Sequence, residues 1–222
     1  MEFIRFFKTV TVSVTAVVFL LTAAPQTVEA QTKKQTKQLE KALNKEYKQK
    51  MAEYKKENWK LAGSSQTLEV ALLTHYKKLA EDAENKEFVG EVSQCQSINV
   101  CKQFALNNAL NRYATLASGH VKGRLESIMR ADAITPQVEM DKFIAAYENL
   151  VKGEVGGVLT ESFSIIKQKG NANEYKTFFI LNEEKAGMAR KKALERSLLE
   201  TKIAAREAEE ISKFVNEGFK LD

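Results

Sequence analysis

A long series of apolar residues at helical spacing constrains the fold of this chain more than any other feature. Between residues 98 and 131 these residues recur every three or four positions, which places them on one face of a single helix. They are Ile98, Cys101, Ala105, Ala109, Tyr113, Leu116, Ala117, Val121, Leu125 and Ile128. Because several of them are alanines, the helix can come very close to the layer that it covers.

Three strand-like segments supply that layer. Residues 87–94 precede the long helix, and residues 155–167 and 175–181 flank a connector rich in Gly and Asn, which is typical of a hairpin turn. A second helix is expected between these segments, with Thr135 as its cap and Pro136 as its first residue. We therefore predict an α+β fold that is mostly helical, with long helical arms at both ends. Its small antiparallel sheet is covered on one face by the long helix and its successor.

Residues 1–30 have the pattern of a secretory signal peptide. A positively charged start precedes an apolar stretch at residues 9–24, and Val28-Glu29-Ala30 places small side chains where a signal peptidase reads. This stretch is shorter than the ~20 residues that a membrane-spanning helix needs. We expect cleavage after Ala30 and export to the periplasm or cell envelope, with an uncleaved anchor as the alternative.

Residues 31–62 form a basic arm. They hold ten lysines and four glutamates, a net charge of +6, whereas residues 63–222 carry −1. An apolar stripe at helical spacing runs along the arm: Leu39, Leu43, Tyr47, Met51, Tyr54 and Leu61. The candidate partner-binding residues are the first six lysines of the arm, Lys33, Lys34, Lys37, Lys41, Lys45 and Lys48.

Two interpretations of this arm remain open. In the favoured one, the helix docks its stripe on the domain and leaves its lysines in water. The alternative is a basic amphipathic helix that binds an anionic membrane surface or an acidic partner, as in a chaperone-like protein. The expected partner is a protein or an envelope component, and the helical arms also allow oligomers. Export argues against nucleic acid.

The remaining segments complete the predicted organisation. Residues 63–85 form a helix that begins at a Gly63-Ser64-Ser65 break, and His75 lies on its apolar face. Residues 86–182 form the α+β core domain. Residues 183–222 form a C-terminal helix, capped by the residue that precedes it, Asn182.

The two cysteines, Cys95 and Cys101, bracket the junction between the first strand and the long helix. An even number of cysteines in an exported chain favours a disulfide. Free buried thiols are the alternative. The five-residue spacing between them is uncommon in zinc sites, and two histidines are too few to complete one.

The sequence predicts no catalytic, cofactor-binding or metal-binding residues. It has two isolated histidines, and it lacks a glycine-rich phosphate loop and a Gly-x-Ser-x-Gly motif. Adjacent glutamates such as 183 and 184 point about 100° apart on a helix, so they do not form a general acid–base pair. We therefore expect a non-enzymatic, exported envelope protein with a binding or structural role through its helical arms.

Part of the chain resembles a known family. Residues 88–97, the alanine-bearing helix and the segments GGVLTESFSII and EYKTFFIL are similar to the LPP-twenty-type lipoprotein family of small bacterial envelope domains. The likeness covers residues 86–184. It implies a compact α+β domain in the bacterial envelope, with no catalytic residues to carry over. The chain departs from the family in lacking the lipid-accepting cysteine, and Gly170-Asn171 replaces the Asp-Gly hairpin turn.

Overall fold

The computed structural model describes the backbone of residues 26–129 and 134–219, and the side chains of residues 41–128 and 134–219. Most of the predicted signal peptide, residues 1–25, lies outside the described residues. The chain divides into two units, residues 1–42 and residues 43–222, and the helix α1 (Gln26–Lys56) has residues in both. Within the described part of the chain, every helix is too short or too polar to cross a membrane.

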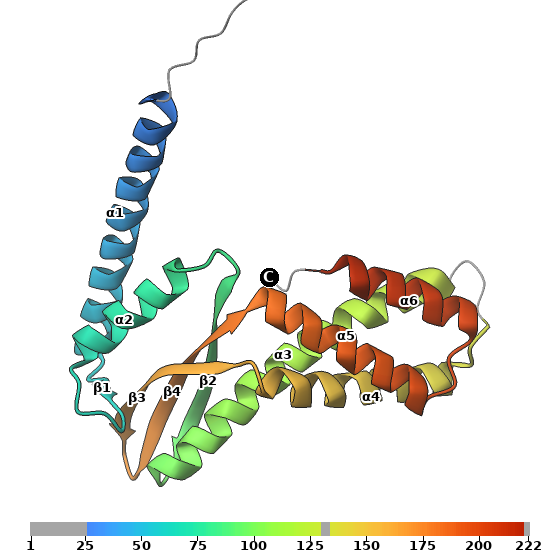
Figure 1. Cartoon of the computed structure of the whole chain (residues 1–222). Helices are drawn as coiled ribbons and strands as arrows, with labels where there is room; N and C mark the ends of the chain where they lie inside the picture. The colour runs from blue at the N-terminus through green and yellow to red at the C-terminus, as the bar shows by residue number, and fades with distance from the viewer. Residues whose placement is uncertain (1–25, 130–133, 220–222) are drawn as a thin grey trace, which may run out of the picture. The chain divides into compact units, whose positions relative to one another are not determined.

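The second unit is built on a four-stranded antiparallel sheet, which confirms the predicted α+β class. The strands lie in the order β1-β3-β4-β2, as Figure 1 shows. Their bounds are β1 (Lys60–Leu61), β2 (Asn85–Cys95), β3 (Thr160–Lys169) and β4 (Ala172–Asn182). The sequence analysis missed β1, whose Lys60 lies opposite Ile166. A two-residue strand is too short to show any periodicity.

The first strand of the hairpin begins later than predicted. Helix α4 (Gln137–Gly156) continues to Gly156 because Val155 is buried among the other helices. Gly156 and Gly157 therefore end a helix and do not open a strand. The predicted cap of this helix is also wrong. Pro136 is the N-cap, whereas the Thr135 hydroxyl accepts a hydrogen bond from the Ala204 amide at 2.8 Å.

Helix α3 (Ile98–Met129) covers one face of the sheet as predicted. It comes so close to β2 that only a glycine fits at position 90, beneath Ala105. Nearby, the Phe88 and Tyr113 rings meet edge to face with their centroids 5.3 Å apart. Leu116, which the sequence analysis placed on the apolar face of this helix, is only half-buried and belongs to none of the buried clusters. The prediction that α4 also covers the sheet is wrong, because α4 packs on α3 and α5.

The opposite face of the sheet is covered by α2 (Leu68–Ala80) and the end of α1. Helix α2 begins three residues beyond the predicted break, and its N-cap is Thr67, whose hydroxyl accepts a hydrogen bond from the Val70 amide. The buried residues between these helices and the sheet are Met51, Tyr54, Trp59, Ala71, Leu72, Tyr76, Phe163, Ile165 and Phe178. The apolar stripe of α1 is therefore docked on the domain, with Leu43 and Tyr47 half-buried and Met51 and Tyr54 buried.

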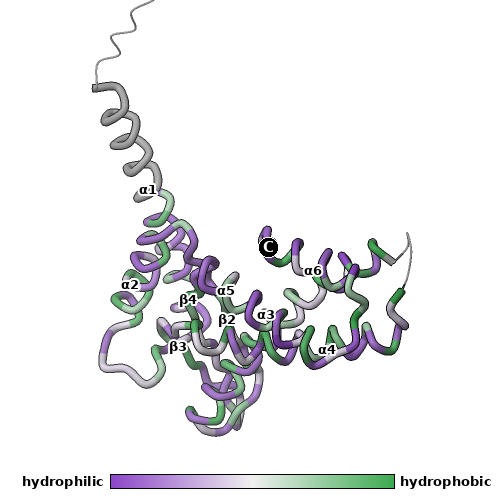
Figure 2. Tube along the Cα trace, turned by 45° about the vertical axis from the view of Figure 1, so that its right-hand side comes forward, coloured by the Kyte–Doolittle hydropathy of each residue, from purple (hydrophilic) through white to green (hydrophobic). Residues whose placement is uncertain are grey.

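Two helices form the end of the chain, where one was predicted. Helix α5 (Glu183–Glu200) begins at the predicted cap Asn182, and α6 (Ala205–Glu217) folds back to bury Ile211 and Val215. Figure 2 shows hydrophobic and hydrophilic residues alternating along α4 and α6, as expected for helices with one buried side. No Pro or Gly separates α5 from α6, so the local sequence gives no signal for this break. The packing of α6 on the other helices imposes it instead.

The predicted disulfide between Cys95 and Cys101 is confirmed. The two Cα atoms lie 5.3 Å apart, and both residues are buried against Ala105 and Tyr175. It links the end of β2 to the first turn of α3.

Replacing both cysteines with alanine should lower the free energy of unfolding by about 2 kcal/mol, because the bridge restricts the unfolded chain. Urea denaturation measures this. The wild-type protein with its disulfide reduced should match the double variant. Equal stability of the oxidised and reduced proteins would contradict the expectation.

A buried carboxylate ties α6 to the start of α4. Glu207 is fully buried and accepts hydrogen bonds from the amides of Ile134 at 3.0 Å and Thr135 at 3.1 Å. Burial opposes ionisation of Glu207, but these hydrogen bonds outweigh it and hold the pKa of this carboxyl below its usual range.

Glu207→Gln should therefore reduce stability at pH 7 by about 2 kcal/mol, the range expected for hydrogen bonds to a charged group. A lowered folded-state pKa stabilises the protein above the unfolded-state pKa, about 4.3, and this contribution disappears as pH falls through the folded-state value. The wild-type protein and the variant should thus converge in urea denaturation at pH 3. A difference that stays constant with pH would refute this expectation. The exposed Glu209→Gln is the control on the same helix.

Candidate functional site

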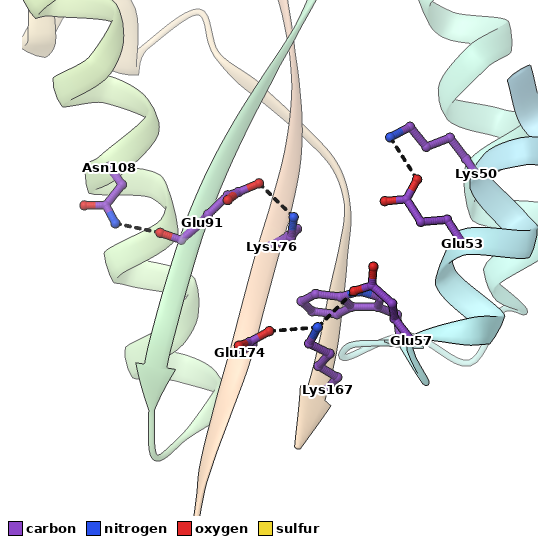
Figure 3. Close-up of polar contacts among 9 residues, drawn as sticks. Lys50, Glu53, Glu57, Glu91, Asn108, Lys167, Glu174 and Lys176 are labelled. Atoms are coloured by element: carbon purple, nitrogen blue, oxygen red, sulfur yellow. Dashed lines mark hydrogen bonds and ion pairs between the residues drawn. The ribbon is translucent and has the colours of Figure 1, made fainter. Parts of the chain in front are cut away.

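A polar groove crosses the sheet on the side that α1 and α2 cover only in part. The strand register places Lys167 opposite Glu174 and Glu91 opposite Lys176. All four side chains project from the same face of the sheet. Residues directly across an antiparallel pair share a face, and Glu174 and Lys176 are two residues apart on β4. Lys167 Nζ lies 2.9 Å from Glu174 Oε2, and Lys176 Nζ lies 2.9 Å from Glu91 Oε1 (Figure 3).

Trp59 forms one wall of this groove, and the local backbone explains its position. Helix α1 ends at Lys56. Two residues later Asn58 adopts a positive φ of 58°, and the Trp59 amide donates to the Tyr54 carbonyl at 2.9 Å. Asn is one of the few residues that tolerate this conformation. The chain thereby turns the indole onto the sheet. Lys167 and Lys176 lie 4.5 and 5.5 Å from the ring centroid, in range for cation–π attraction.

The charges of the groove hold one another in their ionised forms. Lys167 and the Trp59 indole N–H hold the pKa of Glu57 below its usual range, and Lys169 with Lys167 does the same for Glu174. Hydrogen bonds to Glu174 and Glu57 raise the pKa of Lys167 in turn. These shifts lower the pKa values of the two acids and raise that of the lysine. All three pKa values thus move away from neutral pH, where a general acid–base catalyst has to titrate. The arrangement therefore suits binding better than proton transfer.

Two hollows lie along the groove. The larger has a volume of about 320 Å³ and contains Trp59, Lys167 and Glu174. The smaller, of about 120 Å³, lies between α1, α2 and the sheet. They share Glu91 and Lys176, and Figure 3 shows these two residues facing Lys50 and Glu53 of α1.

A separate cavity of about 590 Å³ lies between the start of α5 and the end of α6. Its most buried polar group is Arg190, which is 3% exposed and donates hydrogen bonds to the Tyr113 hydroxyl and the Phe219 carbonyl. Arg190 Nη1 also lies 2.7 Å from Glu183 Oε1, and the guanidinium stacks on the Phe219 ring. Burial raises the pKa of Tyr113 to about 12. Arg190 joins α3, α5 and the end of the chain, which is a structural role.

No protein-family model, curated protein or solved structure matches this chain. The family resemblance stays a prediction. The groove and its chemistry must therefore be interpreted from the residues themselves.

The lysines predicted to bind a partner are not part of the groove as far as the structure describes them. The side chains of Lys33, Lys34 and Lys37 lie outside the described residues. Lys41, Lys45 and Lys48 are exposed on α1, and none of these three lines either hollow.

His75, which the sequence analysis placed on the apolar face of its helix, is a core residue. It is fully buried, its Nε2 lies 2.6 Å from Glu87 Oε2, and its ring packs on Phe163 at 5.3 Å. Among the described residues, no group of three or more His, Cys, Asp or Glu side chains is arranged to hold a metal ion.

The sequence analysis missed the groove because its residues come from three distant segments, around positions 57–59, 91 and 167–176. One signal was present: the hairpin carries Lys167 and Lys169 on one strand and Glu174 and Lys176 on the other. Complementary charges on two paired strands indicate a polar face.

Proposed function

We propose that this chain is an exported, non-enzymatic protein of the cell envelope that binds another envelope component through α1. The observation that carries the proposal is the division of the α1 surface. Met51 and Tyr54 are buried on the sheet, whereas Lys41, Lys45 and Lys48 are exposed. The helix is anchored by its apolar side, and its lysines remain free to meet a negatively charged partner.

Two further observations support export. The Cys95–Cys101 disulfide is of the kind that persists in oxidising compartments. Residues 1–30 carry the pattern of a cleavable signal peptide. N-terminal sequencing of the protein from the envelope fraction should give Gln31 first, and a start at Met1 in the cytoplasm would overturn the localisation.

The docked stripe supports recognition by the charged side of α1 over insertion of its apolar side into a membrane. A basic amphipathic helix that lies in a membrane interface inserts its apolar side. In α1, Met51 and Tyr54 are committed to the domain, and Leu43 and Tyr47 are half-buried against the same cluster. The charged side is thus the part that recognises a partner, and salt should weaken the interaction because the Debye length is only ~8 Å at physiological ionic strength.

Crosslinking in intact cells tests the proposal. The variant Lys41→Gln/Lys45→Gln/Lys48→Gln should lose a specific protein or envelope crosslink that the wild type forms. The control Lys185→Gln/Lys202→Gln/Lys213→Gln removes the same charge from exposed sites on or near α5 and α6 and should keep it. Equal crosslinking by both variants would refute a role for α1. Salt-sensitive binding to anionic vesicles, lost only in the α1 variant, would favour the membrane-surface alternative.

A further inference from the structure

The smaller hollow of the groove has an excess of negative charge that the protein does not neutralise. Its lining carries four carboxylates, from Glu46, Glu53, Glu87 and Glu91, and two ammonium groups, from Lys50 and Lys176. Lys176 pairs with Glu91 at 2.9 Å and Lys50 with Glu53 at 3.4 Å. Even if His75 behind Glu87 is protonated, one negative charge is left over.

The hydroxyl of a largely covered tyrosine opens into this hollow and has no hydrogen-bond partner among the described residues. Tyr54 is 4% exposed and lines the hollow, and within the described residues its hydroxyl makes no hydrogen bond. Burial raises the pKa of Tyr54, and the charges of Glu87, Glu53 and Glu91 raise it further, so this hydroxyl lies among the carboxylates. By contrast, the Tyr76 hydroxyl donates a long hydrogen bond to Glu46 at 3.4 Å.

The remaining walls are apolar. Leu72 of α2, Val89 of β2 and Phe178 of β4 line the hollow, and the Tyr54 and Phe178 rings are 6.3 Å apart. An occupant must therefore combine positive charge with a short hydrocarbon part. The carboxylates come from α1 and β2 and are too dispersed to hold a metal ion. A dispersed set of carboxylates beside aromatic rings matches a protonated amine on an alkyl chain.

We propose that the hollow between α1, α2 and the sheet binds a primary alkylammonium group, with Tyr54 and the surrounding glutamates as its polar partners and Leu72, Val89 and Phe178 around its methylenes. The source of the amine is either a free polyamine or a lysine side chain of a peptide, because both present the same group. This site does not depend on the lysines of α1 that carry the proposed function.

Titration with 1,5-diaminopentane, followed by methyl NMR of Leu72 and Val89, tests the site. Saturable shifts confined to these methyl groups are expected, and they should be absent with the neutral analogue 1,5-pentanediol. A Gly-Lys-Gly peptide is titrated in parallel. Tighter binding of the diamine identifies a free amine as the source, and tighter binding of the peptide identifies a lysine side chain.

Two variants assign the contacts. Tyr54→Phe keeps the ring but removes the hydroxyl, and it should weaken binding about tenfold, the effect of losing one hydrogen bond to a charged group. Glu46→Gln/Glu53→Gln removes two carboxylates of the hollow and should weaken binding at least about as much. The matched control Glu195→Gln/Glu209→Gln makes the same change in net charge on α5 and α6, at two exposed sites, and should bind like the wild type.

The proposal is wrong if neither amine shifts the Leu72 and Val89 methyl groups, because Lys50 and Lys176 would then serve as the only cations of the hollow. It is also wrong if the control variant loses as much affinity as the hollow variant, since binding would then follow net charge alone. Thermal melts of each variant, compared with the wild type, separate lost binding from lost folding.

Discussion

Gly90→Ala should destabilise the protein by about 3 kcal/mol or more, because a side chain here has no space. A Cβ atom on Gly90 would lie 1.9 Å from the Ala105 carbonyl oxygen and 2.6 Å from its carbonyl carbon. Both partners are backbone, in β2 and in α3, so neither can move aside as a flexible side chain would. Relief requires the long helix to lift off the sheet.

Gly119→Ala and Gly123→Ala provide matched controls. Both glycines lie in α3, and a Cβ at either position meets no atom within 4 Å. Each control should leave stability unchanged or raise it by up to about 1 kcal/mol, because alanine is the better helix former. Chemical denaturation of the three variants measures the difference. If Gly90→Ala matches the controls, α3 does not pack against β2 at this distance.

This contact shows how far the sequence can predict the fold. The alanines of α3 correctly predicted a close approach, because their small side chains let the helix backbone come near the sheet. The position that receives Ala105 could not be predicted, since Gly90 lies in a strand where glycine has several explanations. The same holds for β1 and for the break before α6, where distant contacts and not local patterns decide the structure.

Glu183→Gln should lower the free energy of unfolding by about 3 kcal/mol, because it leaves a buried cation without its counter-charge. Arg190 is 3% exposed, and Glu183 is the carboxylate that pairs with it at 2.7 Å. The Tyr113 hydroxyl and the Phe219 carbonyl would remain as its partners, but neither carries a compensating charge.

A double-mutant cycle isolates this effect. Arg190→Met removes the cation and keeps an apolar chain, and the double variant Glu183→Gln/Arg190→Met should recover much of the loss. Glu184→Gln, at the next position of α5 and exposed, is the control for changes at the helix start. Additive losses in the double variant would mean that the two side chains do not stabilise each other.

The candidate site was harder to predict than the fold. Sequence reasoning placed recognition on six lysines of the basic arm, because a concentration of like charge is visible in a linear sequence. The groove depends on Glu57, Glu91 and Lys167, which approach one another only after the sheet has formed. Neither its hollows nor the unpaired hydroxyl of Tyr54 has any signature in the local sequence.

The order of the strands has a consequence for the time course of folding. Strand β1 pairs with β3 and β2 pairs with β4, so each early strand must wait for a partner that lies about 80 to 105 residues further along the chain. Until β3 and β4 have been synthesised, Trp59, Met51 and the apolar side of α2 have no surface to cover. The N-terminal part of the chain should therefore stay open until late in synthesis, because long-range pairing must first overcome the entropy of closing these loops.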